Sequence, residues 1–335
     1  MAVKTKKTPS KALPESYKQH RNVFLPILLV TVCMGIALLT SVINNFFYPL
    51  GKEPLSPLVI QIVSLLIPAS LLFMIIYPEG STLKNFKSIG FHRIRAEHVF
   101  PIIFTSLFLI TSSLMINLCL GGFYAVADGF TILGSFTAGV GEYSTTYPYI
   151  AIIYAIAPAM IEEFIFRGMI QTELSKKDDF FAICLSSLIS AAFSFTLGGL
   201  PAAILCALTY CFIRSLTGSL FASIILHTVF NLYAVFLQTN VAKYFLSSQN
   251  NLLLIIIIVI AWLVSSALFF SEMARVYRAR AEKIKKGEAT STLPTISFKS
   301  LGKALKEIFA FRPTLVTTII GGVFFIAITA LGYFA

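Results

Sequence analysis

The chain has 335 residues, of which 57% are hydrophobic and only 12% are charged. A soluble domain carries roughly 25% charged residues, so this composition excludes an ordinary soluble globular protein as well as disordered and collagen-like chains. The net charge is +11. In so apolar a chain we interpret this excess as a signal of membrane topology, and we expect no nucleic-acid partner.

The apolar segments are continuous and do not alternate with polar residues, which favours transmembrane helices over a β-barrel. In chain order they occupy residues 23–43, 57–77, 100–120, 147–166, 180–197, 201–214, 219–237, 252–270 and 314–334. The sequence therefore predicts an all-α, polytopic helical membrane bundle with about nine transmembrane helices. The segment 201–214 is short, so eight is the alternative.

The basic residues predict the orientation of these helices. If the N-terminus is cytoplasmic, Lys52 and Lys243 are the only two of the 26 Lys and Arg residues that fall outside the cytoplasmic segments, as the positive-inside rule requires. We divide the chain into four parts: a basic tail (1–22), N-terminal transmembrane helices (23–84), a core (85–237) and an extension with two more helices (238–335).

The extension contains a basic inner loop, residues 272–313. Within it, apolar residues recur at helical spacing with lysines between them: Phe298, Leu301, Leu305, Ile308 and Phe309, with Lys299, Lys303 and Lys306. This pattern predicts an interfacial amphipathic helix that contacts anionic lipid. A solvated linker is an equally good interpretation.

Two acidic residues continue an apolar segment, and charged groups inside a membrane are functional by default. Glu163 and Arg167 are four residues apart and can pair on one helix face. Glu162 lies about 100° away around the helix and lacks a helical partner, so it is poised as a general base for a water molecule. The structural alternative is an ion-pair cluster that ends the helix. Pro158, upstream, is expected to kink the helix.

A second polar pair lies in the segment 219–237. His227 and Asn231 are four residues apart, so both side chains project from the same helix face. Both can donate hydrogen bonds to a developing oxyanion. A single histidine in a membrane helix is more often a helix–helix hydrogen-bonding residue than a catalyst, and it is the combination with the glutamate pair that favours catalysis.

These residues, in this order, resemble the CPBP family (CAAX proteases and bacteriocin-processing enzymes, including the Abi proteins and the type II CAAX prenyl endopeptidases). Its EExxxR motif is matched by Glu162, Glu163 and Arg167, and its HxxxN/D motif by His227 and Asn231. Between them, residues 217–220 (Thr-Gly-Ser-Leu) resemble the turn that precedes the last motif. The resemblance covers roughly residues 85–237.

The resemblance implies a prokaryotic cell-membrane protease that cleaves a membrane-anchored peptide or protein entering from the cytoplasmic face. By position, Glu162 would activate the water, His227 and Asn231 would stabilise the oxyanion, and Glu163 and Arg167 would orient the site. We expect these five residues to face one cavity.

One position departs from the family. Its second motif, FxxxH, aligns best with Phe193 to Leu197, so Leu197 stands where a water-holding histidine is expected. Activity is therefore expected to be weakened. The alternatives are a non-catalytic membrane scaffold or bacteriocin-immunity-type protein and, less favoured, a transporter. No cofactor is expected. Zinc is disfavoured because catalytic zinc usually takes three protein ligands, and a divalent metal is left open.

Overall fold

The computed structural model of the chain describes residues 15–47, 62–77, 82–120, 147–192, 200–238, 251–287 and 298–334. All regular elements in these ranges are helices and none is a strand, which confirms the predicted all-α class. Five of the described helices are long and apolar enough to cross a membrane, or six if one bent pair counts as a single span. The predicted number of nine is not confirmed.

The difference in number arises from three predicted segments, 57–77, 147–166 and 180–197, in which the structure describes only shorter elements. The segment 57–77 is described only from residue 62, as a π-helical turn followed by α3 (Ile67–Ile76). The segment 180–197 contains α11 (Asp179–Ala192), and both helices are shorter than the ~20 residues that span a bilayer. The short segment 201–214, in contrast, belongs to an 18-residue helix, α12 (Leu200–Thr217).

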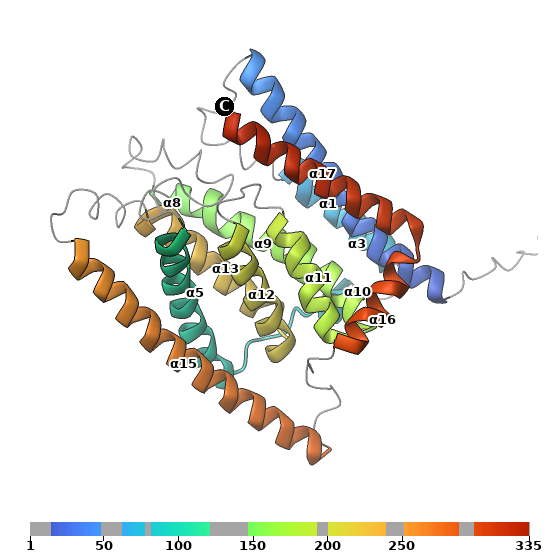
Figure 1. Ribbon diagram of the computed structural model, residues 1–335. Helices are drawn as coiled ribbons and strands as arrows, with labels where there is room; N and C mark the ends of the chain where they lie inside the picture. Colours follow the sequence, from blue (N-terminus) through green and yellow to red (C-terminus); the bar gives the residue numbers. More distant parts are fainter. Residues whose placement is uncertain are drawn as a thin grey trace, which may run out of the picture.

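The two ends of the chain pack against each other. The first helix, α1 (Glu15–Phe47), begins within the predicted tail, which is helical from residue 15 onward. It lies beside α17 (Arg312–Phe334) (Figure 1), where the Thr31 hydroxyl donates a hydrogen bond of 3.3 Å to the Thr317 carbonyl. The C-terminal extension is therefore part of the same bundle as the N-terminal helices.

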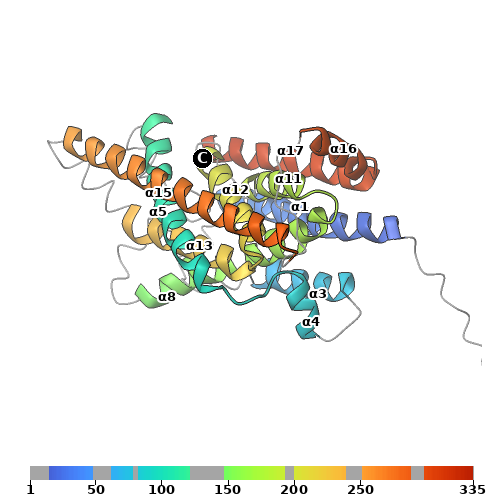
Figure 2. The same ribbon diagram turned by 90° about the horizontal axis from the view of Figure 1, so that it is seen from below.

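A second long-range pair joins α5 (Val99–Leu120) to α15 (Asn251–Lys285) (Figures 1 and 2). The rings of Phe108 and Phe269 stack with their centroids 4.4 Å apart. Nearby, the Trp262 indole donates a hydrogen bond of 3.1 Å to the Ser112 hydroxyl. These contacts fix α15, the other helix of the extension, on the core.

The central rod of the bundle carries the acidic motif and alternates between α- and π-helical geometry. Its elements are α8 (Tyr147–Ala151), η4 (Ile152–Ile156), α9 (Ala157–Glu163), η5 (Phe164–Gln171) and α10 (Thr172–Ser175). Pro158 stands at the start of α9, directly after the π-helical turn η4. Wider π turns often occur at functional sites, and here η5 begins immediately after the glutamate pair.

The helix α16 (Phe298–Phe309) confirms that the predicted amphipathic segment is helical. Its apolar residues Ala304 and Ile308 are buried in the same core cluster as α1 and α3, so protein covers part of the face that was expected to contact lipid. On its polar side, Glu307 pairs with Lys177 at 3.1 Å. A bend of 98° separates α16 from α17.

The turn between α12 and α13 (Leu220–Leu232) is fixed by the segment around Gly90. Gly90 and Gly218 have φ angles of +98° and +70°, which glycine adopts without steric cost. The Leu220 amide donates to the Gly90 carbonyl at 2.6 Å, and the Ser219 hydroxyl donates to the His92 carbonyl at 2.6 Å. These bonds set where α13, with its polar pair, enters the bundle.

Candidate active site

Glu163 and Arg167 form a buried ion pair at the centre of the candidate site. Nη1 of Arg167 lies 3.0 Å from Oε1 of Glu163, and both side chains are fully buried. This pair is the one expected from the four-residue spacing. A buried charge is tolerated only with a partner and further hydrogen bonds, and Arg167 also donates to the Ser190 hydroxyl at 2.9 Å and to the Ala207 carbonyl at 3.2 Å.

His227 lies between the two glutamates. Its Nδ1 atom is 2.8 Å from Oε1 of Glu163, and its Nε2 atom is 3.9 Å from Oε2 of Glu162. Because a carboxylate only accepts hydrogen bonds, the short contact places the Nδ1 proton on the Glu163 side. A neutral His227 then presents the unprotonated Nε2 toward Glu162. The side chain of Glu162 is 26% exposed, in contrast to the fully buried Glu163.

Tyr210, on α12, orders the same cluster from a third helix. Its ring stacks on the His227 imidazole with centroids 4.9 Å apart and an interplanar angle of 20°. The Arg167 guanidinium lies 5.3 Å from the centre of the same ring, within the range of a cation–π contact. The Tyr210 hydroxyl is buried and has no hydrogen-bond partner among the described residues. Its ring is therefore the part of Tyr210 that supports the site.

Asn231 is one turn further along α13 and does not contact the glutamates. It is buried, and its Nδ2 atom donates to the Ala155 carbonyl in η4 at 3.3 Å. This is a helix–helix hydrogen bond of the kind that polar residues make in membrane bundles. The structure thus brings Glu162, Glu163, Arg167 and His227 into one cluster and connects Asn231 to the same rod.

Below Arg167, a second polar contact joins the rod to α12. The Gln171 side-chain amide donates to the Cys211 carbonyl and to the Ser215 hydroxyl, both at 2.9 Å. Gln171 is fully buried, and it lies one turn of the π-helical segment beyond Arg167. The two residues fix the rod against α12 at two levels, so the site stands on rigid elements.

Leu197, the position of the second motif, lies outside the described residues, as do Phe193 and the rest of residues 193–199. The expectation that all five motif residues face one cavity near Leu197 therefore stays a prediction. Among the described residues, no three His, Cys, Asp or Glu side chains are grouped so that they could hold a metal ion.

Two features of the site were missing from the sequence-based prediction. Tyr210 carries no signal that separates it from other aromatic residues of an apolar segment. The direct His227–Glu163 contact was also missed, because the relative rotation of α9 and α13 depends on packing across the bundle.

One family of known proteins matches this region of the chain. Residues 144–233 match the family described as type II CAAX prenyl endopeptidase Rce1-like, and this range includes Glu162, Glu163, Arg167, His227 and Asn231. Comparisons with curated proteins and with solved structures gave no match. Residues 144–233 of this apolar, helical membrane protein are therefore similar to the Rce1-like domain of type II CAAX prenyl endopeptidases.

Proposed function

We propose that the chain is an intramembrane endopeptidase in which Glu162 activates a water molecule that attacks a peptide bond. The family match supports this class of activity. The observation that carries the mechanism is the placement of His227, with one ring nitrogen on Glu163 and the other 3.9 Å from Glu162. A purely structural ion-pair cluster would not require a partly exposed carboxylate opposite an imidazole nitrogen.

The spacing of these two atoms suits a shared water molecule. The two acceptors, Oε2 of Glu162 and Nε2 of His227, are 3.9 Å apart. A water oxygen about 2.8 Å from each of them would form an acceptor–oxygen–acceptor angle of roughly 90°. Both atoms accept hydrogen bonds in this state, so the water can donate one hydrogen to each. His227 would then supply the second water-holding group that Leu197 cannot provide.

The chemical step follows from this placement. Glu162 takes a proton as the water oxygen bonds to the peptide carbonyl carbon, and the carbonyl electron pair moves to the oxygen. The second hydrogen of the Asn231 amide stabilises the resulting oxyanion, since the first is bonded to Ala155. Glu162 then returns the proton to the peptide nitrogen as the carbon–nitrogen bond breaks. Glu163 and Arg167 hold His227 in place.

The proposed substrate is a peptide or protein anchored in the membrane. The charge distribution supports a cytoplasmic N-terminus. From the family resemblance we propose a prokaryotic cell membrane, with substrates entering from the cytoplasmic side. We extend this proposal to the inner loop, where Lys299 and Lys303 are exposed on α16 and would contact anionic lipid.

The test is cleavage of a membrane-anchored reporter peptide by the full chain. Glu162→Gln keeps the shape of the side chain but removes the base, so cleavage is expected to fall by ~10²–10⁴ while reporter binding is retained. Glu282→Gln is the matched control because Glu282 is an exposed carboxylate at the end of α15. Equal cleavage by the native chain and Glu162→Gln would remove the proposed role of Glu162.

A second candidate function rests on Leu197. A family member without the second-motif histidine could bind substrate without cutting it, as a membrane scaffold or an immunity-type protein. In that case the native chain binds the reporter without cleaving it, and Glu162→Gln changes nothing. The same assay therefore separates the two functions.

A further inference from the structure

A cavity of about 380 Å³ lies at the end of the bundle where α12 turns into α13, away from the glutamate pair. Three parts of the chain form its walls: the segment 92–98 before α5, the turn 216–218, and one face of α15. Its main lining residues on α15 are Arg275, Val276, Ala279, Arg280 and Lys283. None of the five motif residues lines this cavity.

The lining of the cavity is strongly cationic. Five basic side chains face it, and they come from two sites far apart in the sequence: Arg93, Arg95, Arg275, Arg280 and Lys283. Glu97 is the one acidic residue in the lining. Two more carboxylates lie beside it, because Glu272 pairs with Arg275 at 2.7 Å and Asp179 interacts with Arg280. Even with all three carboxylates counted, the cations exceed the anions by two.

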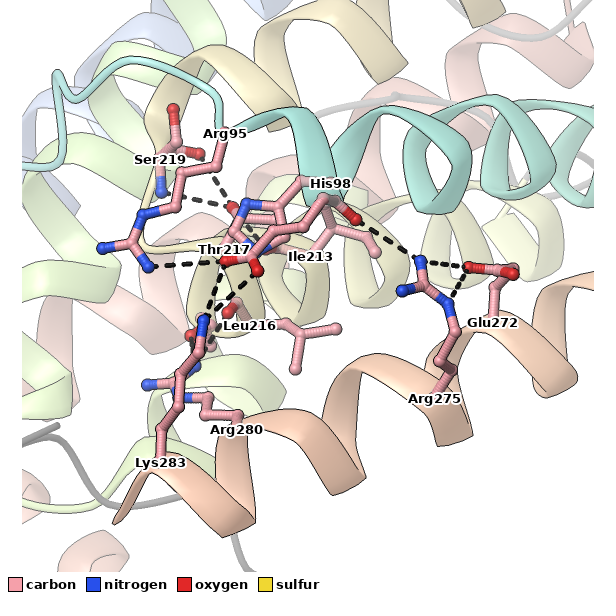
Figure 3. A network of polar contacts seen from close by, with 12 residues as sticks. Arg95, His98, Ile213, Leu216, Thr217, Ser219, Glu272, Arg275, Arg280 and Lys283 are labelled. Atoms are coloured by element: carbon pink, nitrogen blue, oxygen red, sulfur yellow. Dashed lines mark hydrogen bonds and ion pairs between the residues drawn. The ribbon is translucent and has the colours of Figure 1, made fainter. Parts of the chain in front are cut away.

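Glu97 acts as an internal anion within this cluster. Its carboxylate lies 3.2 Å from Nζ of Lys283 and 3.4 Å from Nη1 of Arg95. Figure 3 shows Arg95 and Lys283 approaching the Thr217 turn from different elements, while Arg275 lies further along α15 beside Glu272. The pairs are long and partly exposed, so they are individually weak. An incoming anion can therefore bind both Arg95 and Lys283.

Two other basic residues have different roles. Arg280 donates hydrogen bonds of 2.6 and 2.8 Å to the carbonyls of Ser215 and Leu216, near the C-terminal end of α12, and so fixes α15 against the turn. Arg93 is exposed and makes no ion pair with a described residue. The cavity thus combines an anchored frame with cations that remain available.

His98 adds an observation independent of charge. The residue is 94% buried and lines the cavity, and its Nδ1 atom has no hydrogen-bond partner among the described residues. An unpaired buried polar atom costs about 1–3 kcal/mol, so such atoms are usually satisfied by a ligand or water. Its Nε2 atom lies 3.8 Å from Oε1 of Glu97, which places the ring beside the carboxylate that pairs with Arg95 and Lys283.

We infer that this cavity binds a phosphate-bearing anion, through Arg93, Arg95, Lys283 and His98. The guanidinium groups of Arg93 and Arg95 come from one element and the Lys283 ammonium group from another, and together they match the oxygens of a phosphate better than a single carboxylate does. The apolar wall of Leu216, Val276 and Ala279 suits the carbon skeleton of a phosphodiester. The anion is either the head group of an anionic phospholipid or a free phosphate, and it is separate from the peptide substrate proposed above.

This site differs from general attraction of the inner loop to the membrane. Two of its five basic side chains come from the segment 92–98, which lies far from residues 272–313 in the sequence, and the anion would be held in a cavity. Binding is therefore expected to depend on Arg95 and Lys283 more than on the exposed lysines of α16. It does not depend on whether the chain cleaves peptides.

The test uses the full chain purified in a zwitterionic detergent. Native mass spectrometry would measure binding of phosphatidylglycerol against phosphatidylcholine, and a second arm would add inorganic phosphate as a competitor. The double variant Arg95→Gln/Lys283→Gln is expected to bind phosphatidylglycerol at least tenfold more weakly. The matched control is Lys87→Gln/Lys285→Gln, which removes the same charge from exposed positions outside the cavity and outside α16 and should bind as the native chain does.

Glu97→Gln provides a test of opposite sign. Removal of the internal anion frees Arg95 and Lys283, so binding should become several-fold tighter, which a merely structural role of the cluster would not produce. If inorganic phosphate competes with phosphatidylglycerol, free phosphate is sufficient to occupy the site. If phosphatidylglycerol binds and inorganic phosphate does not compete, the ligand is the lipid head group. Equal loss in the two double variants, or no gain in Glu97→Gln, would overturn the inference.

Discussion

The Nδ1 atom of His227 lies 2.8 Å from Oε1 of Glu163, so the second glutamate of the pair orients the imidazole and the first faces its other nitrogen. The same carboxylate oxygen is 3.0 Å from Nη1 of Arg167. A single buried group thus links the cation of η5 to the histidine of α13. A carboxylate that fixes the tautomer and position of a histidine is a familiar device of catalytic sites.

If Glu162 and His227 share one water, they should behave as a unit. His227→Gln is expected to lower kcat by ~10²–10⁴, the usual contribution of a positioned acid–base group. Adding Glu162→Gln should then cost little more, because residues that act together are not additive. Single-turnover cleavage of the reporter peptide by the two single variants and the double variant gives the comparison. Multiplicative losses would show that the two residues act independently.

Loss of the buried ion pair between Glu163 and Arg167 should appear first as lower stability of the fold and only then as lower activity. Arg167→Met leaves Glu163 charged without its main partner and is expected to cost about 3–5 kcal/mol. The double variant Glu163→Gln/Arg167→Met should recover part of this loss, because no uncompensated charge remains. Thermal unfolding in detergent measures both.

A matched control for this prediction is the pair between Lys177 and Glu307, whose side chains are 30% and 39% exposed. Lys177→Met should leave Tm nearly unchanged because solvent screens exposed pairs. Similar losses at the buried and exposed pairs would contradict the expected dependence on burial.

The ring of Tyr210 should contribute to catalysis and its hydroxyl should not. Tyr210→Phe keeps the ring that stacks on His227 and should leave kcat near the native value. Tyr210→Leu removes the stack, worth about 0.5–1.5 kcal/mol, and should lower kcat about two- to tenfold. Measuring KM alongside kcat separates positioning of His227 from substrate binding. A loss in Tyr210→Phe equal to that in Tyr210→Leu would assign the role to the hydroxyl instead.

The sequence predicted the parts of this structure that depend on local spacing. The pairing of Glu163 with Arg167 follows from helix periodicity, and the helix Phe298–Phe309 follows from the pattern of apolar residues between lysines. Continuous apolar segments predicted the helical class, because a membrane-spanning chain must satisfy its backbone internally. Helix lengths were less predictable, since α3 and α11 have only 10 and 14 residues within apolar segments that were expected to span the membrane.

What the sequence could not indicate depends on packing between distant segments. The contact of α1 with α17 and the rotation that points His227 at Glu163 are set by side-chain fit across the bundle. The basic residues of α15 indicated topology alone, because nothing local places Lys283 next to Glu97, which stands 186 residues earlier.

The two glycines with positive φ should differ in their tolerance of a side chain. Gly218→Ala has open space around the new Cβ, so it should cost only the ~1–2 kcal/mol of left-handed backbone. Gly90→Ala should cost more, because its Cβ would stand 3.3 Å from Nη2 of Arg214. That atom donates hydrogen bonds to the Ile89 carbonyl and to Thr172, which the new methyl group would displace. Thermal unfolding of the two variants tests the order.

The remaining prediction concerns Leu197, which lies outside the described residues and whose role rests on the family resemblance. An apolar side chain at this position cannot hold a water, so Leu197→His should raise the rate of reporter cleavage. We expect a gain of about tenfold, at or below the lower end of the ~10²–10⁴ of an acid–base residue, because His227 already presents a nitrogen 3.9 Å from Glu162.

The matched experiment combines Leu197→His with Glu162→Gln, and Leu197→Gln serves as a polar control that cannot act as a base. A gain in Leu197→His that disappears in the double variant would support a water held by Glu162 and residue 197 together. If the native chain is already fast and Leu197→His is neutral or harmful, the alignment of the second motif with Phe193 to Leu197 is wrong. His227 would then be sufficient as the partner of Glu162, because its Nε2 atom already faces that carboxylate.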